Sequence, residues 1–369
     1  REPVFRVPTL TLESDDWGAG PAAQAPALRR LRETLEACRD GAGRPAVMTL
    51  GVVLETADRD AMRANGSMRY ESLRLDDEPM QPVLDEIHAG VGSGVFTPQL
   101  HGLAHYWEAS LGKAAASSAE VRRWLDGAGP GWTEELPAPL QSRWIDVSEL
   151  PSRPLPPDAV MAAVCLEVDA WQRVFGAAPV VAVPTTFIWN DIVERAYAKA
   201  GIHALITPGH RCESRNAQGE PVAGATSIAN GQHGAGGILY LVRDIYFEPV
   251  LGHPPWRLCS EVAARSALGR PALVEIHRFN FCGSRAQEDA FNTLADALRL
   301  VRENLPSVRF AASAELADAV ARKDPAWLET RAARRAAICA RRALELPKFG
   351  RLARLTGLAW PLRAIGALA

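Results

Sequence analysis

Short apolar runs alternate with stretches of helical spacing along most of the chain. The run at 46–55, AVMTLGVVLE, is nearly unbroken, as is typical of a strand covered on both faces. Residues 157–175 instead repeat their apolar positions at helical spacing. This alternation predicts a parallel sheet with covering helices, either open or closed into a barrel of about seven strands. The strand-like runs lie at about 4–12, 46–55, 95–100, 179–187, 203–209, 238–249 and 271–281, with a short one at 308–312.

Two adjacent carboxylates follow the first strand-like run, in the sequence LTLESDDWG at residues 10–18. The strand is expected to end at Glu13, so that Asp15 and Asp16 lie at its carboxyl end, where α/β proteins gather their chemistry. The same Ser-Asp-Asp sequence also suits the N-cap of a helix that begins near residue 22, or a simple turn. Other reactive side chains at the same edge of the sheet would favour a functional site over a cap or a turn.

Two histidines follow a later strand, in the sequence HGLAH. On a helical turn, the i, i+4 spacing places the imidazoles of His101 and His105 on one face, an arrangement that holds metal ions. Two surface histidines at this spacing are about as common. Two neutral imidazoles with one carboxylate make the three-ligand, open-position set of catalytic zinc sites. The second carboxylate is then left to act as a base on water.

A third histidine lies in the strong apolar run at 271–281. In a parallel sheet, the end of this strand brings His277 to the same edge as Asp15 and Asp16. A lone histidine at this position also suits the core or the rim of a barrel. Three strand ends that each carry His or Asp favour a shared site.

Composition and charge restrict the class of protein without identifying it. The 369 residues are 47% hydrophobic and 23% charged, with a formal net charge of −2, values typical of one large globular domain or two small ones. Near-neutral charge and few aromatic residues argue against a nucleic-acid partner. No apolar run reaches the roughly 18–20 residues of a membrane-spanning helix. Six scattered cysteines, without a CxxC pair, favour a reducing compartment.

Residues 326–369 differ in charge from the rest of the chain. They hold nine Lys or Arg against two Glu, interleaved with apolar residues and interrupted by Pro347 and Pro361. We therefore expect a barrel over 1–325 and a basic amphipathic helical tail over 326–369. Such a tail is either a solvated face packed on the barrel or a contact for a membrane surface or an acidic partner. A cytoplasmic or membrane-peripheral location is expected, and export is compatible because a removed leader would leave no trace in this sequence.

The order of these motifs resembles that of the polysaccharide deacetylase (NodB-homology) superfamily over about residues 5–322. Its members are metal-dependent carbohydrate de-N-acetylases on a distorted (β/α) barrel of about seven strands. The resemblance therefore implies an α/β fold of this kind, here with a C-terminal basic helical extension. It also implies that Asp15 is the catalytic base and His277 the general acid. The metal ligands that it implies are Asp16, His101 and His105.

The chain departs from the family pattern in ways that bear on activity. The usual first motif is TFDDG, whereas Trp17 stands here between the Asp pair and Gly18. The usual third motif supplies an arginine that holds the base, and the strand VPTTFIWND has none. The usual Ser or Thr after the first histidine of HGLAH is also missing. The candidates for supporting the base or the oxyanion are Arg243, Arg278 and Trp17.

The resemblance implies hydrolysis of an acetamide on an amino-sugar glycan or glycan precursor, with a divalent metal, zinc first, as cofactor. Asp15 would take a proton from the attacking water and His277 would give one to the leaving amine. Removal of an O-acetyl or N-formyl group by the same residues is the alternative within the enzyme class. The alternative outside it is a carbohydrate-binding barrel without turnover, suggested by the missing third-motif arginine.

Overall fold

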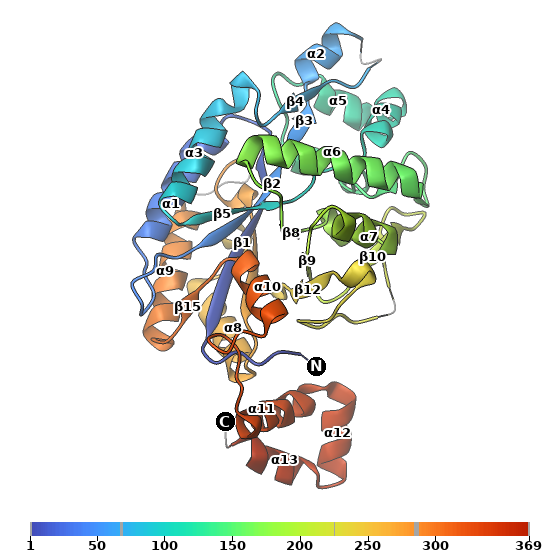
Figure 1. Ribbon diagram of the computed structural model, residues 1–369. Helices are drawn as coiled ribbons and strands as arrows, with labels where there is room; N and C mark the ends of the chain where they lie inside the picture. Colours follow the sequence, from blue (N-terminus) through green and yellow to red (C-terminus); the bar gives the residue numbers. More distant parts are fainter. Residues whose placement is uncertain (1, 67–68, 225, 284–287, 368–369) are drawn as a thin grey trace.

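A curved parallel sheet forms the centre of the protein (Figure 1). This computed structural model describes residues 2–66, 69–224, 226–283 and 288–367. All the strand pairs in the sheet are parallel, as the alternation of strands and helices predicts. In order along the sheet, the strands are β12 (Leu239–Val242), β9 (Ala204–Thr207), β8 (Val181–Ala182), β5 (Phe96–Leu100), β2 (Met48–Val53), β1 (Thr9–Gly18), β14 (Ala272–His277) and β13 (Ile245–Tyr246), while β15 (Arg309–Phe310) pairs with the start of β1.

One continuous segment supplies the strands at both ends of the sheet. β12 pairs with β9 and β13 pairs with β14, yet only Arg243 and Asp244 separate β12 from β13. The segment therefore brings the two ends together and closes the sheet into the distorted (β/α) barrel that was expected. The single strand predicted over 238–249 is split because its two halves pair with different neighbours. Counted once, the split strand makes the barrel seven-stranded.

Helices cover the outside of this barrel, and its central strands are buried on both their inner and outer faces. Every residue of β2 is buried, and in β1 Asp16 alone is partly exposed. The helix predicted over 157–175 has those bounds. The covering helices are α1 (Gln24–Glu36), α3 (Gln81–Gly92), α6 (Pro157–Phe175), α7 (Asp191–Lys199), α8 (Pro255–Ala267), α9 (Asp289–Asn304) and α10 (Ser313–Arg322).

The strand predicted over 179–187 is cut short after two residues. Pro184 cannot donate a ladder hydrogen bond, and a 3₁₀ turn over Thr185–Phe187 follows it. Within that turn Thr186 and Phe187 adopt positive φ angles of 52° and 54°, which are unusual for residues other than glycine. The turn brings both side chains to the carboxyl end of the barrel.

Segments inserted between the strands build the upper rim of the barrel. They include a helix pair that begins at Glu108 and a 3₁₀ turn over Thr133–Glu135. Residues 210–237, between β9 and β12, contain a short hairpin. The elements of the rim are α2 (Arg59–Ala64), α4 (Glu108–Ser117), α5 (Ala119–Leu125) and the hairpins β3–β4 (Glu55–Ala57, Ser72–Arg74), β6–β7 (Ile145–Asp146, Arg153–Pro154) and β10–β11 (Cys212–Arg215, Pro221–Ala223).

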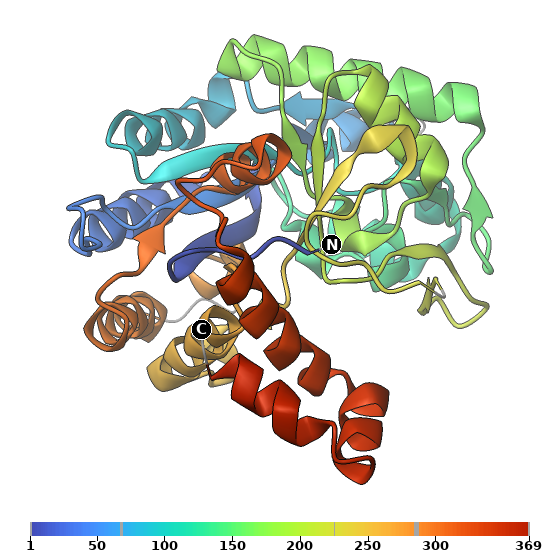
Figure 2. The ribbon, with the colours of Figure 1, turned by 60° about the horizontal axis from the view of Figure 1, so that its bottom comes forward.

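Three helices follow the barrel and project from one end of it (Figures 1 and 2). They are α11 (Ala332–Glu345), α12 (Pro347–Leu355) and α13 (Ala359–Gly366), so the helical extension expected at the C-terminus is present. Residues 368–369 of the predicted tail lie outside the described residues. Among the helices that the structure describes, none is both long and apolar enough to cross a bilayer. All six cysteines are free thiols.

Candidate active site

A bulge in β1 turns both carboxylates of the Asp pair toward one pocket. Ser14 pairs with Leu50 and Trp17 with Val52, so β1 has one residue more than β2 across this interval. Asp16 is that extra residue, and its φ of 74° breaks the alternation of side chains between the two faces. The strand therefore does not end at Glu13, as predicted from the sequence, but continues through the Asp pair to Gly18.

The register between β1 and β14 places Asp15 directly beside His277. Residues opposite each other on neighbouring strands project from the same face of the sheet, so both side chains face the pocket. Gly51 on β2 makes room on the other side of Asp15, because a Cβ atom there would lie 2.4 Å from Asp15 Oδ1. The proposed base and acid are thus brought together by two adjacent strands of the barrel.

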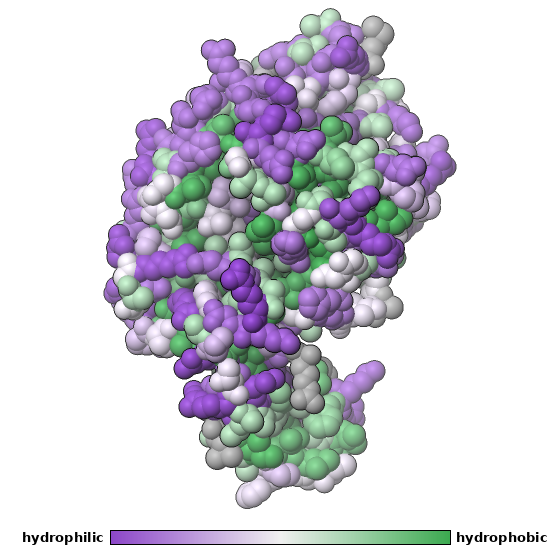
Figure 3. Space-filling model, in the orientation of Figure 1, coloured by the Kyte–Doolittle hydropathy of each residue, from purple (hydrophilic) through white to green (hydrophobic). Residues whose placement is uncertain are grey.

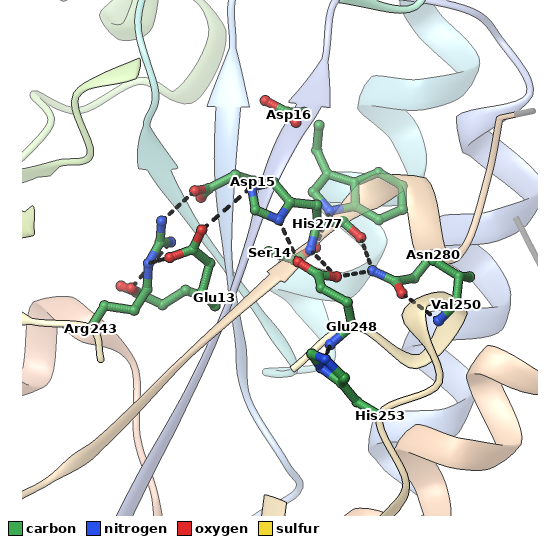
Figure 4. Close-up of polar contacts among 12 residues, drawn as sticks. Glu13, Ser14, Asp15, Asp16, Arg243, Glu248, Val250, His253, His277 and Asn280 are labelled. Carbon is green, nitrogen blue, oxygen red and sulfur yellow. Dashed lines mark hydrogen bonds and ion pairs between the residues drawn. The ribbon is translucent and has the colours of Figure 1, made fainter. Parts of the chain in front are cut away.

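Arg243 occupies the gap between β12 and β13 and points into the barrel (Figure 4). Its Nη2 donates a hydrogen bond of 2.6 Å to Asp15 Oδ2, and its guanidinium also lies 3.4 Å from Glu13 and from Glu275. Burial disfavours the charged form of Asp15, but the positive charge of Arg243, its hydrogen bond to Asp15 and the charge of His277 outweigh this effect. The pKa of Asp15 is therefore lowered from its usual value.

His277 has a carboxylate partner of its own. Its Nδ1 lies 2.5 Å from Glu248 Oε1, and its backbone N–H donates to Glu248 Oε2 at 3.1 Å (Figure 4). Burial by itself would lower the pKa of His277, but the hydrogen bond and charge of Glu248 raise it to about 10. Because Nδ1 is engaged by Glu248, Nε2 is the nitrogen that carries the exchangeable proton toward the pocket.

Asp16, His101 and His105 converge beside this pair. Asp16 Oδ1 lies 3.3 Å from His101 Nε2 and 3.2 Å from His105 Nε2. The ligand atoms of the three residues lie within 4.8 Å of one another, and among the described residues Asp16 Oδ1 is buried without a hydrogen-bond partner. Atoms bound at about 2.0–2.1 Å to a tetrahedral metal are separated by about 3.3 Å. The three residues therefore fit a divalent metal of that kind.

The segment that carries the two histidines is a bent loop and not the helical turn predicted from their spacing. Gly102 has a φ of 113°, which only glycine adopts readily, and this bend brings the two imidazole centroids to 5.0 Å. His101 Nδ1 lies 2.9 Å from the carbonyl oxygen of Val183. A carbonyl oxygen only accepts, so Nδ1 carries the proton and Nε2 presents its lone pair to the site.

A buried ion pair holds this loop in place from behind. The side chain of Glu167, on α6, accepts from the backbone N–H of Leu103 at 3.1 Å and from Arg143 Nε at 3.0 Å. Arg143 also pairs with Glu108 at 2.8 Å, and it is buried. Glu167 therefore ties the backbone of the loop to Arg143, whose own charge is shared between two carboxylates.

The pocket that contains these groups has a volume of about 340 Å³ and opens at the carboxyl ends of the strands. Carboxylates and aromatic rings share its wall, which suits a polar ligand with an apolar ring face. Besides the groups described above, its lining residues include Glu134, Gln141, Thr186, Phe187, Tyr246 and Phe279.

Two of the three candidates for supporting the base lie elsewhere. Trp17 is buried behind the bulge, where its Nε1 donates to Ser14 at 2.8 Å and its ring stacks on Phe281. Arg278, the first residue of a 3₁₀ turn that follows β14, is buried beneath the rim and pairs with Glu134 at 2.5 Å. Arg243 alone among the three contacts Asp15.

Neither a protein-family model nor a curated protein sequence matches the chain. Among solved structures it is similar to a polysaccharide deacetylase from Mycobacterium smegmatis, with 11% identity and a TM-score of 0.43 over 90% of this chain and 98% of that one. It is also similar to a family 4 carbohydrate esterase from Streptomyces lividans, with 10% identity and a TM-score of 0.36 over 82% and 90%. A family CE4 pseudoenzyme from Bacillus anthracis has 10% identity and a TM-score of 0.40 over 85% and 66%. Of these three structures, the first bears the polysaccharide deacetylase name of the family that the sequence motifs resemble.

Several residues of the site were not singled out from the sequence. Glu248 lies near the end of the run at 238–249, and Glu275 lies in the run at 271–281, two residues before His277. An acidic residue within a strand-like apolar run is the signal that both carry. Gly51 interrupts the most apolar run of the chain, which is the usual sign of a close approach between two parts of the backbone. Arg143 and Glu167 carry no comparable signal, because neither interrupts an apolar strand.

Proposed function

We propose that the protein is a metal-dependent hydrolase that removes N-acetyl groups from an amino-sugar glycan or glycan precursor. The observation that carries this proposal is that two adjacent side chains, Asp15 and His277, are held in oppositely charged forms. Arg243 favours the ionised form of Asp15, while Glu248 favours the protonated form of His277. A carboxylate base and an imidazolium acid side by side are what amide hydrolysis requires at neutral pH.

The residues of the pocket divide the reaction among them. Asp15 Oδ2 is held by Arg243, while Oδ1 has no hydrogen-bond partner among the described residues and accepts a proton from the attacking water. The C–N bond of the acetamide then breaks, and His277 Nε2 donates the proton that the leaving amine needs. The products are acetate and a free amine.

A divalent metal, zinc first, is the proposed cofactor, held by Asp16, His101 and His105. When bound, such an ion polarises the substrate carbonyl and acidifies water. Among the candidate supports, Arg243 is proposed to hold the base, which is the role that the family's third-motif arginine usually has. The reason for expecting a binding barrel without turnover is thereby weakened.

The glycan partner is supported by the wall of the pocket. Phe187 and Phe279 offer ring faces, whereas Gln141 and Thr186 offer hydrogen-bonding groups. Aromatic faces beside polar side chains suit a sugar ring, which has apolar C–H faces and hydroxyls at its edges. An anionic membrane surface is a separate proposed partner of residues 326–369, and a membrane-peripheral location depends on it.

Acetate release from N-acetylglucosamine oligomers by the zinc-loaded protein tests the proposal. We expect about one zinc per chain and measurable release, and we expect Asp15→Asn to lose release while keeping its zinc, because Asp15 is not a proposed ligand. His105→Ala should lose both.

The alternatives give different results in the same assay. Release of acetate or formate from O-acetylated or N-formylated sugars alone would indicate a hydrolase that removes those groups instead of N-acetyl groups. Bound zinc without release from any of these substrates would indicate a binding barrel. Full activity of Asp15→Asn would show that the assignment of the base is wrong.

A further inference from the structure

The C-terminal helices leave a large apolar surface uncovered (Figure 3). Leu355 and Trp360 are 77% and 80% exposed, the highest values among the exposed large apolar side chains of the described residues. Four exposed basic residues are interleaved with the exposed apolar residues along the same helices. We call this surface the tail patch, and it consists of Leu346, Phe349, Leu352, Leu355, Leu358, Trp360 and Ile365 together with Lys348, Arg351, Arg354 and Arg363.

The apolar arc of α12 is wider than its packing within the protein requires. Gly350 and Ala353 face inward and are buried, so a single row of small residues seats the helix. Phe349 and Leu352, at neighbouring helical positions, point outward instead. A helix that only covers a core usually buries its apolar side chains and exposes polar ones. The exposed apolar side chains of α12 therefore indicate an interaction surface.

The charge of the tail patch is entirely positive. Residues 346–369 contain no Asp or Glu, and the four cations of the patch form no ion pair with any residue that the structure describes. Residues 326–369 carry a net charge of +7, which leaves −9 for the rest of a chain whose total is −2. The molecule is therefore strongly polarised, with its cationic end coinciding with its most exposed apolar surface.

We propose that the tail patch docks on an anionic phospholipid bilayer. Leu and Trp side chains enter the boundary between headgroups and acyl chains, and the surrounding Lys and Arg side chains meet lipid phosphates. An exposed Trp beside basic residues is typical of side chains at this interface. A second copy of the chain is a poor occupant, because a symmetric contact would place the cations of one patch against those of the other.

The tail patch is held rigidly to the barrel through α11. Arg342 is buried and donates to the carbonyl oxygens of Leu268 and Gly269 at 2.7 and 2.9 Å, and to that of Pro3 at 2.8 Å. Ile338 packs closely over Gly269, where added atoms would lie within 3.3 Å of it. Docking of the patch would therefore orient the whole barrel.

Co-sedimentation of the full-length protein with vesicles tests the proposal. We expect binding to phosphatidylcholine vesicles that contain phosphatidylglycerol, little binding to phosphatidylcholine alone, and release at high salt. Leu355→Ser with Trp360→Ser should reduce binding by about ten-fold or more, since both apolar anchors are lost. Arg351→Gln with Arg354→Gln should reduce it by about 25-fold, or roughly five-fold for each charge.

A matched control comes from exposed apolar residues on other faces. Trp256 and Leu166 are 65% and 59% exposed on α8 and α6, and Trp256→Ser with Leu166→Ser should bind vesicles as the natural sequence does. All variants should keep their circular dichroism spectrum and acetate release, because none of these residues lines the pocket.

Three results would overturn the proposal. The first is vesicle binding that the two tail-patch variants leave unchanged. The second is a concentration-dependent dimer that Leu355→Ser abolishes, which would assign the patch to a second copy. The third is salt-sensitive binding to heparin without binding to vesicles, which would assign it to an acidic polymer.

Discussion

Two charge pairs set the protonation of the candidate site at the scale of single residues. Arg243 keeps Asp15 ionised down to a pH below the usual carboxyl pKa, and Glu248 keeps His277 protonated up to a pH of about 10. A reaction that needs both forms is therefore expected to run over a broad pH range that includes neutrality. We expect the acid limb of the rate profile to reflect Asp15 and the alkaline limb to reflect His277.

Glu248→Gln is predicted to move the alkaline limb to lower pH. The raised pKa of His277 depends on the carboxylate, so its loss lets the pKa fall from about 10 toward the ordinary value of 6.5, and the imidazole loses its proton earlier as pH rises. The rate at pH 9 should fall by about 10-fold or more, while the acid limb stays in place. Measurement of kcat/KM against pH checks this.

Glu220→Gln, on an exposed turn, is the matched control for that variant and should leave both limbs unchanged. An alkaline limb that does not move in Glu248→Gln would show that His277 is not the group that titrates there.

The sequence pointed to the residues that gather in the pocket better than to the partners of those residues. Asp15, Asp16 and the three histidines carry recognisable spacing, and the structure brings all five to one pocket. Their supports depend on contacts between distant parts of the chain, such as Glu248 with a histidine 29 residues later. Trp17 and Arg278 lie next to site residues in the sequence, but their side chains bind Ser14 and Glu134 and neither contacts Asp15.

Two irregularities position the site at the scale of secondary-structure elements. The bulge at Asp16 lets one strand contribute a proposed base and a proposed metal ligand in succession. The bend at Gly102 lets a loop bring together two histidines that sequence spacing had assigned to a helix. Sequence periodicity predicts only regular helices and strands. It therefore located the segments around Asp16 and Gly102 correctly but gave the wrong backbone conformation for them. The regular strand β2 agrees with its predicted run, whereas β14 ends at His277 and a 3₁₀ turn over Arg278–Asn280 follows within the strand predicted over 271–281.

Gly51→Ala is predicted to reduce activity by about 100-fold while leaving the barrel folded. The added Cβ would lie 2.4 Å from Asp15 Oδ1 and 3.2 Å from its Cα, so the carboxylate must shift. A displacement of about 1 Å at a reacting group commonly costs this much in rate. Comparison of kcat with the thermal unfolding curve of the same variant distinguishes misplacement from unfolding.

Gly112→Ala is the control for this substitution. Gly112 lies in α4 with open space around its missing Cβ, so alanine should leave the rate unchanged and stabilise the helix by about 0.5–1 kcal/mol. An active Gly51→Ala variant would mean that the position of Asp15 matters less than its contacts suggest.

At the scale of the whole molecule, the proposed metal should stabilise the fold. Its three ligands come from β1 and from the loop after β5, so a bound ion would link segments that are far apart in the sequence. Zinc at about 100 times its Kd should add about 2.7 kcal/mol to the free energy of unfolding. The melting temperature with zinc should therefore exceed that after chelation, as calorimetry can measure.

His105→Ala should abolish this difference, whereas His210→Ala, at an exposed position outside the pocket, should keep it. An equal zinc effect in both variants would place the ion elsewhere on the protein.

The tail patch and the mouth of the pocket lie at opposite ends of the barrel, and this separation limits which substrates are within reach. Arg342 anchors the helices beside the segment that enters β14, while His277 ends that strand. The ten residues of β1 alone span about 33 Å at about 3.3 Å each. If the tail patch rests on a bilayer, the mouth opens toward the aqueous phase. A sugar linked closely to a lipid in that same leaflet is then out of range, whereas a soluble precursor or the distal end of a long polymer can enter freely.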